Sequence, residues 1–230
     1  MQIDVVTLFP QFFEPIVRGS ILGRAQSKEA VTIELHDLWR FVPAGERADD
    51  APYGGGPGMV MRLAPLIACM ESLLGGELAV PDRWRVIVPS PAGMRFDQEQ
   101  ASQLGACERL IFVCGHYEGI DERFFELVAS TEFSLGDFVL TGAEIPALAF
   151  IDATVRLLPG VIKAESAAAE SFARGGGGLD WPHFTRPAVF RGLAVPDVLL
   201  SGDHERVAAW RRDEARSRTL ARRPDLADQS

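Results

Sequence analysis

The sequence predicts an α/β protein built on a mostly parallel β-sheet. Two compact apolar runs, residues 84–88 and 110–113, have the continuous hydrophobicity of buried strands, and a helix-compatible stretch at 97–104 lies between them. This alternation is typical of βαβ units in a parallel sheet. With 230 residues, 47% of them apolar and 24% charged, the chain has room for one large domain, or for a medium domain with a small appendage.

The elements before residue 84 fit the same class. Residues 3–9 form a short apolar run and residues 31–35 alternate in polarity, so both are predicted strands, whereas 13–22 has the spacing of an amphipathic helix. Residues 47–61 hold two prolines and four glycines, which predicts a long irregular loop of functional interest. A helix is predicted over 63–74.

The chain changes character after the predicted sheet. A loop at 134–142 precedes a predicted helix at 144–157, and residues 164–178 then hold five alanines, four glycines and two serines, the composition of a flexible linker. A polar helix is predicted over 203–218. The piece from 181 to 230 is too small to fold well alone, so we expect it to dock on something.

Several classes of protein are disfavoured. Three cysteines without a Cys-x-x-Cys pair argue against a disulfide framework, and no apolar run reaches the roughly 18 to 20 residues that span a bilayer. Residues 1–12 lack the basic start of a secretory signal. Neither a Walker-A phosphate loop nor a Gly-x-Gly-x-x-Gly motif is present. We therefore expect a cytoplasmic protein without a membrane partner.

Charge is distributed unevenly along the chain. The formal net charge is -9, which taken alone argues against a nucleic-acid partner. Residues 204–223, however, contain seven arginines against three acidic residues, a local charge of +4. This basic segment favours contact with phosphates, although a solvated helix face has the same composition.

Two glycine-bearing loops, at residues 89–93 and 115–119, follow predicted strands, and a third candidate loop at 134–142 is expected at the same edge of the sheet. Ligands of open α/β sheets bind at the carboxyl ends of the strands, and glycine lets backbone approach a ligand closely. The loops are consistent with a nucleotide-like pocket, and equally with ordinary turns.

The motifs in these loops resemble those of the bacterial tRNA (guanine-N1)-methyltransferases of the TrmD type, in the SPOUT superfamily. The resemblance covers nearly the whole chain in the same order and rests on the following segments: TLFPQFF (7–13), DAPYGGGPGMVM (50–61), VPSPAG (88–93), CGHYEGIDER (114–123), SLGDFVLTGAEIPAL (134–148), RLLPGV (156–161), LDWPHFTRP (179–187) and VLLSGDH (198–204).

The resemblance implies an enzyme that transfers the methyl group of S-adenosylmethionine to N1 of guanosine 37 of tRNA. It implies a SPOUT-type parallel sheet with a deep trefoil knot, which strand patterning alone would never suggest. The expected organisation is a donor-binding catalytic domain over 1–162, a flexible linker over 163–181 and a small α-helical tRNA-binding domain over 182–230. A homodimer with composite active sites is also implied.

Site residues are carried over by position. The implied donor pocket consists of Pro89, Ser90, Pro91, Ala92, Gly115, Tyr117, Glu118, Gly119, Leu135, Gly136, Asp137, Phe138, Val139, Leu140, Gly142 and Pro146. The implied RNA-binding residues are Arg186, Ser201, Arg211, Arg212 and Arg216. Ala92 and Ala143 depart from the glutamine and the second glycine that are common in the family.

The chemistry requires a base for the proton on guanine N1 and a cation for the charge that develops on O6. The resemblance assigns these roles to a linker carboxylate before Ser-Phe and to an arginine before the Pro-Gly turn. Here the arginine is Arg156 and the carboxylate is Glu170, where aspartate is usual. The alternatives are that Glu170 is only a solvated linker carboxylate, or that Glu165 or Asp180 is the base.

The metal site and the exact function stay open from the sequence. The family's activity is associated with a divalent cation, Mg2+ being the expected ion, but no carboxylate cluster or tetrahedral ligand spacing identifies a metal site. The alternative functions are a related SPOUT methyltransferase that acts on another RNA position, and a catalytically silent protein that binds S-adenosylmethionine and RNA.

Overall fold

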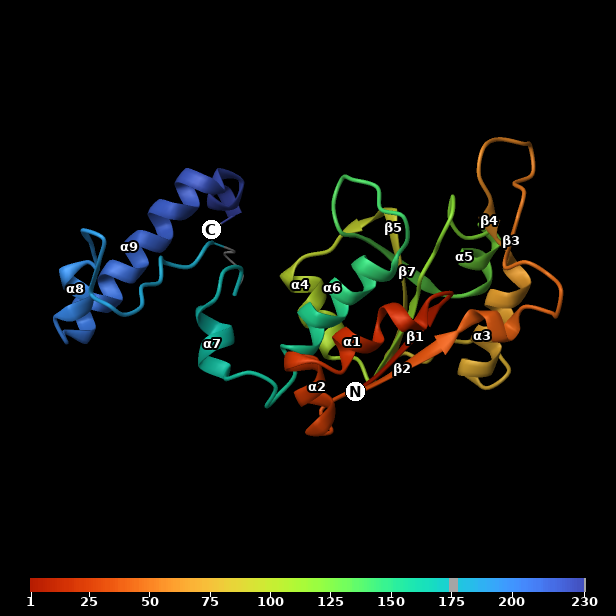
Figure 1. The fold of residues 1–230 in the computed structure, drawn as a ribbon, viewed down its shortest axis with the longest axis horizontal. Helices are drawn as coiled ribbons and strands as arrows, with labels where there is room; N and C mark the ends of the chain where they lie inside the picture. Colours follow the sequence, from red (N-terminus) through yellow and green to blue (C-terminus); the bar gives the residue numbers. More distant parts are fainter. Residues whose placement is uncertain (174–177, 230) are drawn as a thin grey trace. The chain divides into compact units, whose positions relative to one another are not determined.

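The computed structural model describes residues 1–173 and 178–229 (Figure 1). The chain divides into two compact units, Met1–Ile162 and Lys163–Ser230, and each is described by itself.

The first unit is built on a parallel sheet of five strands in the order β2-β1-β6-β5-β7. Its strands are β1 (Gln2–Thr7), β2 (Thr32–Asp37), β5 (Trp84–Arg95), β6 (Arg109–Val113) and β7 (Ser130–Ser134). This confirms the predicted α/β class and its parallel sheet.

Helices cover both faces of this sheet (Figure 1). The helices are α1 (Glu14–Val17), α2 (Ser20–Ser27), α3 (Leu63–Leu74), α4 (Gln98–Gly105), α5 (Arg123–Leu127) and α6 (Glu144–Val155). Side chains of a strand alternate between faces, so Leu110 and Phe112 pack with α1, α2, α4 and α6, whereas Ile111 and Val113 pack with α3 and α5. This two-sided burial explains the continuous apolar runs in the sequence.

The end of β5 differs from the prediction. The run at 84–88 is followed by extended chain as far as Arg95, and the pairing with β7 shifts between Pro89 and Met94, so that the residues between them bulge out. Two prolines in this stretch cannot donate to a ladder, which favours a bulge over regular pairing. Gly93 then fits against the β7 backbone, because a Cβ there would lie 2.5 Å from the carbonyl carbon of Glu132.

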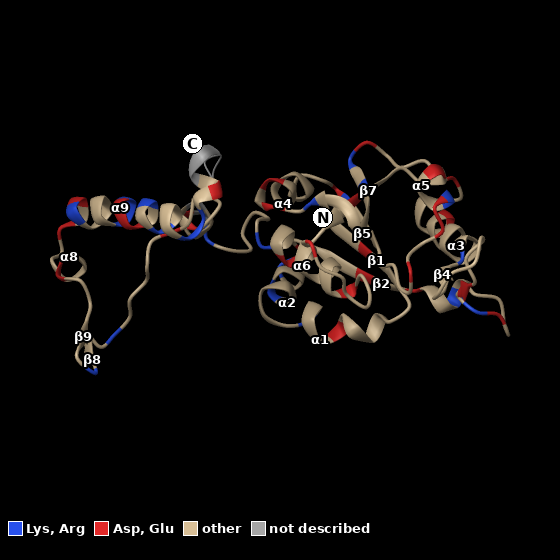
Figure 2. Ribbon diagram, turned by 90° about the horizontal axis from the view of Figure 1, so that it is seen from above, with Lys and Arg blue, Asp and Glu red and all other residues tan. Residues whose placement is uncertain are grey.

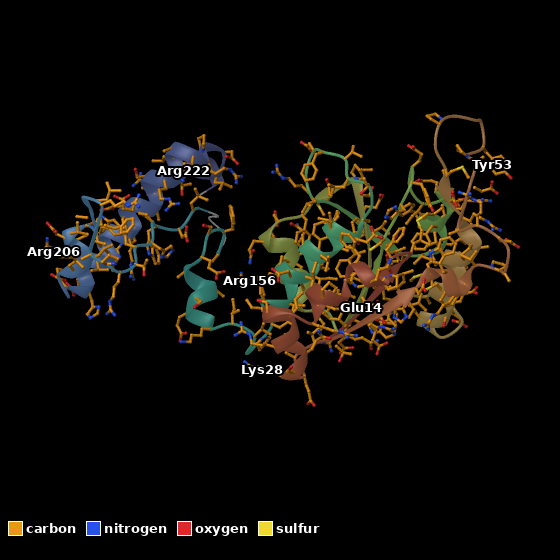
Figure 3. The ribbon with its side chains drawn as sticks, viewed as in Figure 1. Glu14, Lys28, Tyr53, Arg156, Arg206 and Arg222 are labelled. Carbon is orange, nitrogen blue, oxygen red and sulfur yellow. The ribbon has the colours of Figure 1, made fainter. Side chains whose placement is uncertain are left out.

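The predicted irregular loop at 47–61 is largely irregular, apart from a small antiparallel pair at its ends. The two strands are β3 (Asp49–Asp50) and β4 (Val60–Met61). Between them the chain projects into solvent, and Tyr53 is fully exposed (Figure 3).

The second unit is mostly helical. It contains α7 (Ala164–Ala169), a hairpin of β8 (Val189–Phe190) and β9 (Leu193–Ala194), α8 (Asp197–Leu200) and α9 (His204–Arg222). Helix α7 forms within the segment expected to be a flexible linker, where alanine's high helix propensity favours it, and the flexibility of the linker stays a prediction. Part of the glycine run, residues 175–177, lies outside the described residues.

Helix α9 extends four residues beyond the predicted end at 218. Asp203 caps its first turn by accepting a hydrogen bond from the Arg206 amide at 3.1 Å. Basic and acidic side chains are interspersed along it (Figure 2). None of the helices in the described ranges combines the length and apolar character that a membrane crossing requires.

Candidate active site

A cavity of about 350 Å³ opens where β5, β6 and β7 end at the same edge of the sheet. The structure brings nearly all of the residues expected to bind the methyl donor to its wall. Asp137 is the exception, since it does not line the cavity. The lining includes Pro89, Ser90, Pro91, Ala92, Gly115, Tyr117, Glu118, Gly119, Leu135, Gly136, Phe138, Val139, Leu140, Gly142 and Pro146.

The loop after β6 is shaped by backbone conformation. Tyr117 has a φ of 61° and Gly119 a φ of 134°, so the chain turns sharply between them. The turn is fastened to the segment around β4, because the Glu118 amide donates to the Met59 carbonyl and the Met61 amide donates to the Gly119 carbonyl, both at 2.9 Å. The glycine-rich loop at 51–58 is thereby joined to the cavity wall.

The loop after β7 leaves apolar side chains exposed at the cavity. The Ser134 hydroxyl accepts a hydrogen bond from the Gly136 amide at 3.2 Å, which starts the turn. Phe138 and Val139 line the cavity and stay 55% and 84% exposed. Such exposed apolar residues favour a ligand or a partner at this edge.

A buried polar network at the cavity was missed by sequence reasoning. Glu144, in the first turn of α6, is 4% exposed. Its carboxylate accepts a hydrogen bond from the Thr7 hydroxyl at 2.9 Å and lies 3.0 Å from Nε2 of His116. Thr7 ends β1 and His116 follows β6, so only the fold brings these three residues together, and no sequence spacing signals the contact.

The loops after β6 and β7 contact each other at this network. The Ala143 amide donates to the Gly115 carbonyl at 3.0 Å. A Cβ on Gly142 would lie 2.2 Å from His116 Nε2, so only glycine fits beneath the histidine ring.

The electrostatic character of the cavity is negative. Glu118, Glu122 and Glu132 line it, and no lysine or arginine is among the described lining residues. A ligand with positive charge therefore suits this cavity. Burial raises the pKa of the nearby Cys114 thiol well above its usual value, with Glu144 adding to the effect, so this cysteine stays protonated.

The expected catalytic pair is divided between the two units. Arg156 is half-buried at the C-terminal end of α6 (Figure 3), and Glu170 is half-buried at the C-terminal end of α7.

The two alternative bases differ in their surroundings. Glu165 is exposed in the first turn of α7. Asp180 accepts a hydrogen bond from the Ser171 hydroxyl at 3.0 Å and lies 3.1 Å from Nε2 of His183. Burial works to raise the pKa of Asp180, but these hydrogen bonds lower it overall. A carboxylate held in this way is a weaker base than an ordinary one.

The expected RNA-binding residues all lie exposed in the second unit: Arg186, Ser201, Arg211, Arg212 and Arg216. The Ser201 hydroxyl donates to the Val198 carbonyl at 2.7 Å and accepts from the Asp203 amide at 3.1 Å. These two hydrogen bonds stabilise the turn between α8 and α9. Arg206 and Arg222 mark the two ends of α9 (Figure 3).

One cluster in the described parts of the chain has the makings of a metal site, formed by Asp4, Glu34 and His36. It lies on β1 and β2, where Asp4 and Glu34 pair near the middle of their strands, and its residues do not line the cavity. Arg109 Nε sits 2.7 Å from Asp4, and this guanidinium already supplies the positive charge that a cation would bring. The donor set therefore fits an ion pair better than Mg2+.

Comparison with known proteins gives a consistent result. A family model described as tRNA (guanine-1)-methyltransferase TrmD matches residues 1–229. A tRNA (guanine-N(1)-)-methyltransferase from Moorella thermoacetica is 48% identical over 229 residues, which are 98% of this chain and 90% of that protein. The proteins of the same name from Chloroflexus aggregans and Frankia alni are each 49% identical, over 98% and 100% of this chain and 87% and 86% of their own lengths.

Proposed function

The chain belongs to the tRNA (guanine-1)-methyltransferase family, and we propose that it performs the family's reaction with Glu170 as general base and Arg156 as electrostatic partner. The reaction transfers the methyl group of S-adenosylmethionine to N1 of guanosine 37 of tRNA. The observation that carries the proposal is the negative, three-loop cavity at the carboxyl edge of the sheet.

The cavity suits S-adenosylmethionine in size and charge. Its volume of about 350 Å³ falls in the range of about 300 to 1,000 Å³ that is usual for small-molecule sites. When bound, S-adenosylmethionine supplies a methyl carbon on a positively charged sulfur, and that sulfur takes the electron pair of the broken C–S bond. Glu118, Glu122 and Glu132 complement the positive charge, and the glycine-bearing turns offer backbone groups to the nucleoside.

Methylation of guanine N1 requires removal of its proton and stabilisation of the charge on O6, and we assign these roles to Glu170 and Arg156. The Glu170 carboxylate takes the proton from N1 of the target guanine, and the freed electron pair of N1 forms the new bond to the methyl carbon. Arg156 stabilises the negative charge that develops on O6. Glutamate and aspartate have similar reference pKa values, so glutamate can serve as the base although it is one methylene longer.

The remaining features are also proposals. The trefoil knot is proposed on the family resemblance, and the exposed arginines of α9 support a tRNA-binding C-terminal domain. We expect a homodimer with composite sites that works in the cytoplasm. The Mg2+ that the resemblance implies is assigned no ligands here, because the cluster found within the described residues, Asp4, Glu34 and His36, does not line the cavity.

Methyl incorporation from labelled S-adenosylmethionine tests the proposal. The substrates are two tRNA transcripts that carry guanosine at 36 and differ only in having guanosine or adenosine at 37. We expect the native enzyme to label the guanosine-37 transcript alone. Glu170→Gln, which keeps the size of the side chain, should reduce the rate by about 10² to 10⁴-fold, the usual contribution of a general base.

Two controls make the result decisive. Glu170→Asp keeps a carboxylate and should retain more activity than Glu170→Gln, and donor affinity measured by calorimetry should be equal in all variants. A fully active Glu170→Gln enzyme would exclude Glu170 as the base. Donor binding without methylation of either transcript would exclude the proposed reaction.

A further inference from the structure

We propose that a second cavity, within the C-terminal unit, binds one unpaired base of the tRNA other than the target guanine. The cavity has a volume of about 650 Å³ and is formed by the segment 181–188 together with α8 and α9. The inference rests on the proposed function, because it takes tRNA to be the substrate.

The wall of this cavity is aromatic and aliphatic. Trp181 and Phe184 line it from the extended segment, and Leu199 and Val207 line it from α8 and α9. A nucleobase has two apolar π-faces that stack on such side chains, and each stacked base contributes about 1–3 kcal/mol to binding. Bases in a duplex already have both faces covered by their neighbours, so an unpaired base is the one that fits.

The charge of the cavity suits a nucleotide. Arg186 and Arg211 line it, and none of its described lining residues is acidic, the reverse of the donor cavity. The Arg211 guanidinium carbon lies over the Trp181 ring, 4.9 Å from its centre, so a cation is held against one face of the ring. A base and its phosphate would meet an aromatic ring and an arginine together.

The Trp181 segment is held in place rather than left to adapt. The Leu179 amide donates a hydrogen bond to the Thr219 hydroxyl of α9 at 2.9 Å. The Asp180 carboxylate accepts a hydrogen bond from the Ser171 hydroxyl at 3.0 Å. Anchoring of the two residues just before the tryptophan lowers the entropy lost when a ligand stacks on it. The cavity assigned to the methyl donor is lined by residues of the first unit and this one by residues of the second, so we assign the target guanine to the former and a different base to the latter.

Binding of a full-length tRNA transcript to the intact protein, measured at several salt concentrations, tests the proposal. Trp181→Leu removes stacking but no charge, so we expect roughly ten-fold weaker binding with an unchanged salt slope. Trp181→Phe should recover most of the affinity. Arg211→Gln should weaken binding and also reduce the slope by about one phosphate contact.

Phe190→Leu is the matched control. Phe190 is an exposed aromatic of the same unit, lies beside Arg191 and does not line the cavity. We expect its affinity for tRNA to stay within two-fold of the native value. Circular dichroism and donor affinity should be unchanged in all of these variants.

Photocrosslinking locates the base independently. We expect 5-bromouridine at one unpaired position of the tRNA to crosslink to Trp181 or Phe184, and the same label in a paired stem not to do so. Native affinity of Trp181→Leu, or crosslinks that all map elsewhere, would overturn the proposal. So would a Trp181→Leu variant whose oligomeric state changes while its tRNA affinity does not. Binding and crosslinking are read without turnover, so failure of the methylation assay is a separate result.

Discussion

Glu144 shows how one buried side chain can organise the donor cavity. Its carboxylate joins Thr7 at the end of β1 to His116 in the loop after β6, while Glu144 itself starts α6. Removing either partner would leave a buried acceptor without a hydrogen bond, which costs about 1–3 kcal/mol. The three residues therefore fix the relative position of segments that are distant in sequence.

Gly142→Ala should disturb this arrangement and weaken donor binding. The added Cβ would lie 2.2 Å from His116 Nε2 and 2.5 Å from Glu144 Oε2, two atoms that hold each other in place. Overpacking of this kind costs about 1–3 kcal/mol, so we expect donor Kd to rise about ten-fold, as measured by calorimetry. Gly105→Ala is the control, because no atom lies within 4 Å of its added Cβ. Equal donor affinity in the two variants would contradict this role for Gly142.

Asp4, which lies within β1 and does not line the cavity, offers a prediction about the pH dependence of stability. It is fully buried and lies 2.7 Å from both Arg109 Nε and His36 Nε2. Burial works to raise the pKa of Asp4, but the bonds from His36 and Arg109 lower it overall from 3.8. A lowered pKa means that the carboxylate stabilises the fold above its unfolded pKa, and that this contribution is lost as pH falls through the folded pKa.

Asp4→Asn should therefore destabilise the protein most at neutral pH. We expect a loss of about 3 kcal/mol at pH 7, since the half-buried Arg109 loses its partner. The difference from the native protein should persist at pH 5 and narrow below about pH 4, where the unfolded chain begins to bind a proton at Asp4, and it should close as pH falls through the lowered folded pKa. Urea unfolding at pH 7, 5 and 3 measures this, and a gap that is as wide at pH 3 as at pH 7 would refute it.

At the scale of elements, four of the five strands of the sheet and helices α3, α4 and α6 were predicted, whereas β7 and α5 were not, and the helix expected over 13–22 is divided into α1 and α2. Residues 63–74 form a helix with the predicted bounds, because apolar spacing and a glycine after its end both signal it. The bulge of β5 depends on its fit against β7, and α7 arises within a composition that equally suits a linker. Local sequence patterns predict neither the fit of β5 against β7 nor the formation of α7.

The candidate site was foreseen to a similar degree. Motif resemblance identified the loop residues, and the structure places all but Asp137 around one cavity. The Thr7, His116 and Glu144 network was missed because its members lie 28 to 137 residues apart. Whether the lining residues bind the donor remains a prediction.

Helix α9 provides a prediction about an element. Asp203 satisfies an amide of its first turn, and loss of such a cap costs about 1 kcal/mol. In Asp203→Ala we expect hydrogen exchange of the first-turn amides to quicken about five-fold. Asp203→Asn keeps a cap acceptor and should exchange like the native protein. Identical exchange in all three proteins would show that this cap contributes nothing.

At the scale of the molecule, the cavities of the two units are lined by side chains of opposite charge. The overall charge is -9, yet the donor cavity of the first unit is lined by three glutamates and the cavity of the second by two arginines. A cationic donor and an anionic RNA thus have separate complementary surfaces within one acidic protein. The reaction needs both, so the two units must cooperate.

Mixing two inactive variants tests whether that cooperation occurs between subunits. Arg156 belongs to the first unit and Glu170 to the second. If each active site takes Arg156 from one subunit and Glu170 from the other, a dimer of an Arg156→Ala chain with a Glu170→Ala chain has one site with both residues intact and one with neither. Random pairing in a two-fold dimer should then restore about a quarter of the native activity. If both residues of a site come from one chain, neither site of the mixed dimer is intact and no activity returns. The two variants are unfolded and refolded together, and methylation of the guanosine-37 transcript is then measured. Each variant refolded alone is the control. Native enzyme that is fully active as a monomer would exclude composite sites.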